Sequence, residues 1–266
     1  MYAQRPSLTT LLLTALLPLL FALPASGQTG VEVVKKQKEL SKTQDELASL
    51  QMVLVDSQGQ KKERKVTLYT KSDQSGLNKT LIRFTSPRDV ENTALLTWEK
   101  KGGDDDQWIY QTGTDKPRRV SSSGKKNRFA GTEFSFEDLR QEPVDIYEYK
   151  LLGSEDVDGK ACYVVEAYPK TDKEKQDSGY SKRKFWILKD IYFSIKREFY
   201  DPSGALEKIE RSSDIKGVVG SVYRADKVEM EDIRKKTRTM LMVEQRKINQ
   251  GLSDQLFTER ELAKGR

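Results

Sequence analysis

The sequence predicts a mainly β protein with one curled antiparallel sheet and a few covering helices. From Leu50 onward, apolar and polar residues alternate with a period of two, which is typical of half-buried strands. Short turns rich in Gly, Asp and Ser separate the strand-like runs, which favours hairpins over strand–helix–strand units. Only two or three segments have helical spacing, so a sheet of about eleven to twelve strands must curl to cover its apolar face.

The first 27 residues have the three parts of a secretory signal. Arg5 supplies a positive charge, residues 11–23 form an apolar run, and Ala25-Ser26-Gly27 places small residues before the expected cleavage site. The run is short for a membrane span and contains Pro18, although a retained single-span anchor stays open as an alternative. We expect residues 1–27 to be a cleavable signal peptide and the mature protein to be exported to the periplasm.

Residues 28–266 are predicted to form one domain, since no Pro- or Gly-rich linker divides them. Residues 31–50 have helical spacing, with Leu40, Leu47 and Leu50 on one face, so a helix is expected there. Ser253 is placed to cap a short C-terminal helix. Strands are expected at residues 50–56, 65–69, 80–84, 93–98, 107–111, 147–152, 161–167, 182–188, 193–200, 206–212, 222–230 and 237–245.

Residues 118–142 break the strand pattern and are too long for a hairpin loop. Structureless loops of more than about 12–15 residues inside a compact domain are usually functional. Phe129, Phe134, Phe136 and Leu139 make this segment too apolar to lie in water. We therefore expect its apolar part to fold back over the sheet as a short helix or a lid.

Composition excludes several kinds of catalytic site. The 266 residues carry 47 Lys and Arg against 41 Asp and Glu, a net charge of +6, and include no His. Without His there is no Ser-His-Asp or Cys-His catalysis and no His-based zinc site. A single Cys, Cys162, allows no intramolecular disulfide, CxxC pair or iron–sulfur cluster, and neither nucleotide-binding glycine motif occurs. A catalyst built on carboxylates or a lysine stays open, but an enzyme is the least favoured class.

The charged runs are interpreted as surface features. Asp104-Asp105-Asp106 lacks the spaced ligands of a calcium loop, so we expect a turn there, and no metal or cofactor is expected. Arg118 and Arg119 could hold a phosphate or carboxylate, although a solvated charge run is favoured. The basic runs at 182–184 and 234–236 are expected to meet anionic lipid surfaces rather than nucleic acid.

Bulky residues two apart in the strands are predicted to share the inner face of the curled sheet. Such a face can be a packed core or can leave an apolar hollow for a chain-like ligand, and the residues alone favour the packed core. The pairs are Ile82 with Phe84, Leu96 with Trp98, Trp108 with Tyr110, and Met240 with Met242.

Seven stretches of the chain, taken in order, match one family pattern: TALLTW (93–98), DDQWIY (105–110), RRV (118–120), FAGTEFSFEDL (129–139), DGKACYVV (158–165), WILKD (186–190) and FTEREL (257–262). Together they resemble the LolA-like outer-membrane lipoprotein-sorting protein family, in its larger, exporter-associated branch. Two departures from the family pattern concern the expected cavity mouth: Asn92 replaces a usual Gly, and residues 111–115 replace Leu-Pro-Ala.

The resemblance implies an unclosed barrel with a helical lid and an apolar cavity for acyl chains, and we expect the lid to open for cargo. We expect a monomeric periplasmic carrier that transfers lipoproteins or lipids towards the outer membrane, with an inner-membrane exporter or an outer-membrane acceptor as its partner. The alternative is an accessory module that docks on an envelope transporter and binds no lipid. The candidate lipid-binding residues are Ile82, Phe84, Leu96, Trp98, Trp108, Tyr110, Phe134, Phe136, Leu139, Trp186, Met240 and Met242.

Overall fold

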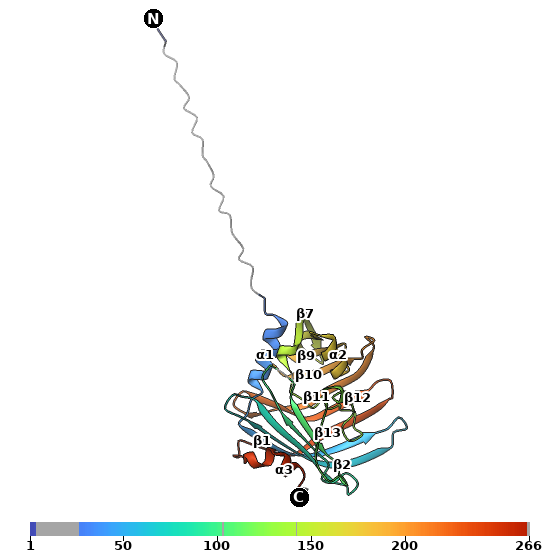
Figure 1. Ribbon diagram of the computed structural model, residues 1–266. Coiled ribbons are helices and arrows are strands. Elements are labelled where there is room, and N and C mark those ends of the chain that lie inside the picture. The colour runs from blue at the N-terminus through green and yellow to red at the C-terminus, as the bar shows by residue number, and fades with distance from the viewer. Residues whose placement is uncertain (4–26, 103, 142, 265–266) are drawn as a thin grey trace.

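The computed structural model describes residues 1–3, 27–102, 104–141 and 143–264, so most of the expected signal peptide lies outside the described residues. Among the described residues, no helix is both long and apolar enough to cross a membrane. Within them, thirteen antiparallel strands form one sheet in the order β6-β5-β4-β3-β2-β1-β13-β12-β11-β10-β9-β8-β7 (Figure 1). The predicted fold class is confirmed, with one or two more strands than expected.

The strand bounds follow the predicted turns closely, and most strands are longer than expected. The strands are β1 (Asp45–Val55), β2 (Lys61–Ser72), β3 (Asn78–Ser86), β4 (Ala94–Trp98), β5 (Asp106–Tyr110), β6 (Arg118–Arg119), β7 (Tyr147–Val157), β8 (Lys160–Pro169), β9 (Lys182–Leu188), β10 (Ser194–Tyr200), β11 (Leu206–Val219), β12 (Val222–Asp232) and β13 (Thr237–Ile248). The helices are α1 (Gly30–Leu40), α2 (Asp172–Ser178) and α3 (Glu259–Leu262), with 3-10 turns η1 (Ser122–Gly124), η2 (Val144–Ile146) and η3 (Asp254–Phe257).

Helix α1 begins at a capping box in which Thr29 and Glu32 bond each other's backbone, and it ends ten residues before the predicted bound. The prediction of a helix as far as residue 50 is wrong because the chain already pairs with β2 and β13 from Asp45. Ala48 and Leu50 are buried at strand spacing on one face of β1. Leu47 and Leu50 therefore belong to a strand, and their helical spacing from Leu40 is a coincidence.

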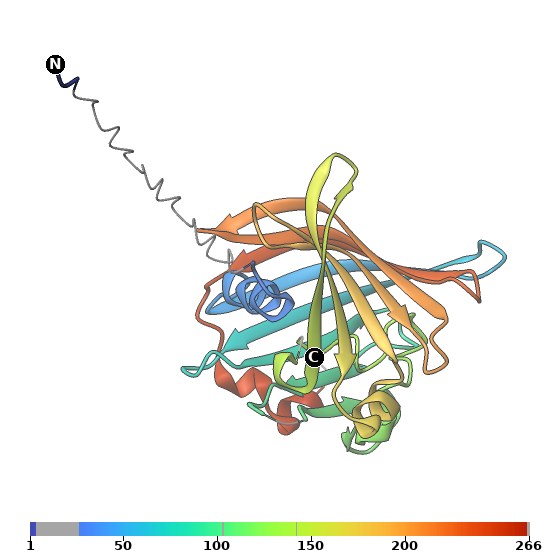
Figure 2. The ribbon, with the colours of Figure 1, turned by 90° about the horizontal axis from the view of Figure 1, so that it is seen from above.

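The sheet curls around α1, which lies against its inner face (Figure 2). Val33 and Val34 of α1 are buried against Phe185 and Ile187 of β9. On the opposite, outer face, η3 and α3 cover β3 to β5 through Phe257 and Leu262. The predicted C-terminal helix is therefore present as two short pieces, the first of which Ser253 caps.

Residues 120–141, here called the strap, leave β6 at one edge of the sheet and lead towards β7 at the other edge. The strap folds back over the inner face, where Phe129 and Phe136 are buried. Of the two forms expected for residues 129–140, a short helix or a lid, the helix is wrong, although the expected folding back over the sheet is present. The chain there forms a compact turn with a bridge between Arg128 and Ser135, because Ala130 and Gly131 take left-handed backbone angles.

Candidate functional site

Two adjoining cavities lie between the strap and the inner face of the sheet. The larger chamber, of about 420 Å³, is bounded by α1, the strap and strands from both halves of the sheet. The smaller chamber, of about 220 Å³, lies beneath the strap and has mainly apolar walls, so we call it the apolar chamber. The two chambers adjoin because they share the lining residues Leu50, Leu68, Thr70, Phe134, Gln141 and Leu241.

Strand register brings the walls of the apolar chamber together. Leu50 of β1 pairs with Val66 of β2, and Leu68 of β2 pairs with Ile82 of β3, so the alternating side chains of three strands face one space. Leu241 of β13 adds the wall beyond β1. The arrangement offers an apolar pocket that can bury a hydrocarbon chain.

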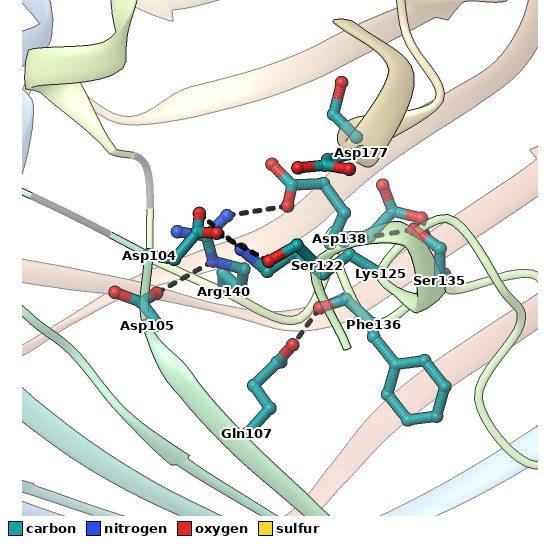
Figure 3. A network of polar contacts seen from close by, with 12 residues as sticks. Asp104, Asp105, Gln107, Ser122, Lys125, Ser135, Phe136, Asp138, Arg140 and Asp177 are labelled. Atoms are coloured by element: carbon teal, nitrogen blue, oxygen red, sulfur yellow. Dashed lines mark hydrogen bonds and ion pairs between the residues drawn. The ribbon is translucent and has the colours of Figure 1, made fainter. Parts of the chain in front are cut away.

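Buried ion pairs hold the C-terminal end of the strap (Figure 3). Arg140 donates to Asp105 at 2.8 Å and to Glu137 at 2.7 Å, and all three side chains are almost fully buried. Arg183 of β9 also pairs with Glu137, at 3.0 Å. Burial alone would lower the pKa of Arg140, but the carboxylates of Glu137 and Asp105 raise it well above its usual value.

Asp138 fixes the strap to the other half of the sheet. Its buried carboxylate accepts from Lys208 of β11 at 2.6 Å, from the Tyr180 hydroxyl at 2.8 Å and from the Ser135 N–H at 2.7 Å. Burial would raise the pKa of Asp138, but Lys208 and the Ser135 N–H lower it below its usual range. Burial and the neighbouring Asp138 raise the pKa of Tyr180 well above its usual value.

Further contacts hold the middle of the strap. The Glu133 N–H donates to Thr239 of β13 at 3.0 Å, and the Gln107 amide of β5 donates to the Phe136 carbonyl at 3.0 Å. Lifting the strap would separate several ion pairs and hydrogen bonds at once, because each of them joins the strap to another part of the chain. The geometry therefore favours a fixed cover over a hinged lid.

The far wall of the larger chamber is polar. Glu46 of β1 accepts from Arg224 and from Arg246, each at 2.8 Å, and Arg197 pairs with Glu210 at 2.5 Å. These charged side chains line the larger chamber, and among the described residues none of them lines the apolar chamber. The cavity therefore changes from apolar to polar along its length.

Five of the sequence-predicted site residues lie on the inner face. Ile82, Phe134 and Leu139 line the apolar chamber itself. Phe84 and Phe136 lie behind it, with their rings 5.5 and 5.8 Å from that of Phe129. These residues remain candidates for contact with a ligand.

The structure places Leu96, Trp98, Trp108 and Tyr110 on the outer face, away from both chambers. They pack beneath the C-terminal segment, where the indole N–H of Trp98 donates to the Phe257 carbonyl at 2.9 Å. The two tryptophan rings are 5.0 Å apart and edge to face. The expected pairing on one face is present, but that face is the outer one.

Trp186, Met240 and Met242 also lie on the outer face. Lys184 and Lys196 stack on the Trp186 ring, at 4.6 and 4.0 Å from its centroid. The two methionines flank Leu241, which faces the chambers, so they point the other way. Alternation alone shows which residues share a face, but not which face is inside.

Several lining residues were absent from the candidate set. Leu50, Met52 and Leu68 follow the same alternation as the candidates and could have been found by extending it to the first two strands. Leu241 required knowledge of the inward face of β13. The Asp104-Asp105-Asp106 run, interpreted as a turn, supplies partners for Lys125, Arg140 and Lys100.

Solved structures with the same fold were found by comparison. A protein domain from Vibrio parahaemolyticus, assigned to outer membrane lipoprotein sorting, is 30% identical, with a TM-score of 0.82 over 88% of this chain and 97% of that chain. A DUF1329 family protein from Desulfovibrio piger is 28% identical, with a TM-score of 0.81 and the same coverage. A LolA superfamily protein from Nitrosomonas europaea, 20% identical with a TM-score of 0.68 over 88% of this chain and 100% of that chain, shares the fold.

Two comparisons of the sequence gave different amounts of information. Comparison with curated proteins gives no match. A family model described as "Uncharacterized protein" matches residues 76–264, which is more than half of the chain. Together with the identity and coverage of the Vibrio domain, this match shows that the chain belongs to the LolA-like family of outer-membrane lipoprotein-sorting proteins.

Proposed function

We propose that this protein is a periplasmic carrier that binds the acyl chains of lipoproteins or lipids and passes them towards the outer membrane. The apolar chamber beneath the strap carries the proposal, because it offers hydrocarbon walls that open into a larger space. Each methylene group buried there contributes about 0.8 kcal/mol to binding. The names of the similar proteins support the same role.

In this proposal the protein catalyses no reaction. It acts as an exported monomer that takes cargo from an inner-membrane exporter or hands it to an outer-membrane acceptor. Affinity comes from burial of apolar surface, so the protein can accept chains of differing length. The polar wall of the larger chamber faces the part of the cargo that remains hydrated.

Native mass spectrometry of the purified full chain tests the proposal. We expect phospholipid or acylated peptide to accompany the wild-type protein. Leu68→Trp should fill the apolar chamber and remove this mass, whereas Thr67→Trp, on the outer face of the same strand, should retain it. A bare mass for the folded wild-type protein would contradict the carrier and favour an accessory module that docks on an envelope transporter.

A further inference from the structure

A third cavity, of about 220 Å³, lies where α1 meets the β4–β5 loop and residues 143–146. Lys38 and Gln141 line both this cavity and the larger chamber, so the two spaces adjoin. Gln141 also lines the apolar chamber. The three cavities thus adjoin in series, from the apolar chamber through the larger chamber to this third cavity.

The rim of this cavity carries four lysines, so we call it the lysine mouth. Two of its three described carboxylates are already neutralised. Glu99 accepts from Lys38 and from the Asn78 N–H, and Asp105 accepts from buried Arg140. The four lysines are Lys35, Lys38, Lys100 and Lys101, and the third carboxylate is Asp145.

Two of these lysines lie outside the ion pairs of the described residues, although hydrogen bonds and, to a lesser extent, the charge of Lys35 lower the pKa of Glu32 on the same helix. Lys35 and Lys101 are exposed, and neither forms an ion pair with any residue that the structure describes. Lys100 is engaged, since it pairs with Asp106 at 2.5 Å. The lysine mouth therefore presents two exposed ammonium groups beside the larger chamber.

We infer that the lysine mouth binds the anionic phosphate or carboxylate head of an amphiphile whose acyl chain occupies the apolar chamber. This inference rests on the proposed function and adds the charge of the cargo's polar end. A charged head cannot enter the apolar chamber without losing its hydration, whereas the mouth offers it opposite charge in contact with water. In this arrangement the chain lies in the apolar chamber and the head in the lysine mouth, with the larger chamber adjoining both.

A competition experiment with a neutral fluorescent probe, N-phenyl-1-naphthylamine, tests the inference. The three competitors are single-chain lipids that carry the same acyl chain and differ only in the head group. The head group is anionic in lysophosphatidylglycerol, zwitterionic in lysophosphatidylcholine and neutral in monoacylglycerol. At low salt we expect the anionic lipid to displace the probe at a concentration at least about fivefold lower than the neutral lipid. The double variant Lys35→Gln/Lys101→Gln should lose this preference. The control Lys61→Gln/Lys62→Gln, which removes the same charge from the exposed start of β2, should keep it.

The outcomes separate the two proposals. If the three lipids displace the probe equally, or if the control variant loses the preference as well, the inference is overturned while the carrier stands. If none displaces it, the carrier fails and the inference fails with it. Glycerol phosphate identifies the source of the anion: a preference that survives ten millimolar glycerol phosphate supports a head group held through its chain. Loss of the preference would show a site for free phosphate and overturn the inference.

Discussion

Asp138 is a fully buried carboxylate whose charge is held by Lys208 and the Ser135 N–H. Its folded pKa lies below the unfolded value of about 3.9. A lowered pKa contributes stability that is present above the unfolded pKa and is lost as the pH falls through the folded pKa. Asp138 therefore stabilises the protein at neutral pH and ceases to do so in acid.

We expect Asp138→Asn to lower the free energy of unfolding at pH 7 by about 3–5 kcal/mol, because Lys208 is left buried without its counter-charge. The difference between wild type and variant should shrink as the pH falls below about 4. Urea denaturation of both proteins at pH 7, 5 and 3.5 measures it. Asp145→Asn, at an exposed position, is the control. A difference that stays constant with pH would show that Asp138 is not the titrating group.

Trp98 illustrates how position on a face decides the role of a residue. It packs on Trp108 and bonds the Phe257 carbonyl beneath the C-terminal segment. We expect Trp98→Asp to lower stability by about 3–5 kcal/mol while the folded fraction binds the neutral probe as the wild type does. Thermal unfolding and probe titration measure the two effects. A stable variant that has lost binding would place Trp98 in contact with the ligand.

At the scale of the element, the strap has few regular hydrogen bonds but many polar anchors. The Phe129 N–H bonds the Phe134 carbonyl, and the Glu137 N–H bonds the Lys125 carbonyl, each at 2.9 Å. Its side chains pair with β9 and β11, and the Glu133 carboxylate accepts from Thr237 of β13. Side-chain contacts therefore take the place of regular backbone pairing in fixing this segment.

Hydrogen exchange can distinguish a fixed cover from a lid. We expect the amides of Phe129 and Glu137 to exchange no faster than those of β13, with or without ligand. Arg140→Met should accelerate them by about 10²–10³-fold, because buried Asp105 loses its counter-charge and Glu137 keeps only Arg183. Arg197→Met, which breaks a more exposed pair, is the control. Rapid exchange of the wild-type strap would contradict the fixed cover and restore the lid.

At the scale of the whole molecule, local sequence patterns predicted the succession of antiparallel strands. They did not predict which face of each strand points into the curled sheet. Turns such as Asp158-Gly159 were found because Gly tolerates the left-handed backbone required there. The inward face of β4, β5 and β13 could not be predicted, since both faces of β4 and β5 are covered by apolar groups. The ion pairs of the strap join residues far apart in sequence, such as Asp138 and Lys208, and no local pattern marks them.

The strand order has a consequence for folding. Along the described chain, strands adjacent in sequence are also adjacent in the sheet, except that β6 and β7 lie at opposite edges and β1 pairs with β13. The segments β1 to β6 and β7 to β13 can therefore each form from local hairpins, whereas pairing of β1 with β13 must close nearly the whole chain. Met52 and Leu241 face each other across that last pairing, and both line the apolar chamber. The apolar chamber is thus complete only when the two halves meet, because Leu241 closes the wall beyond β1.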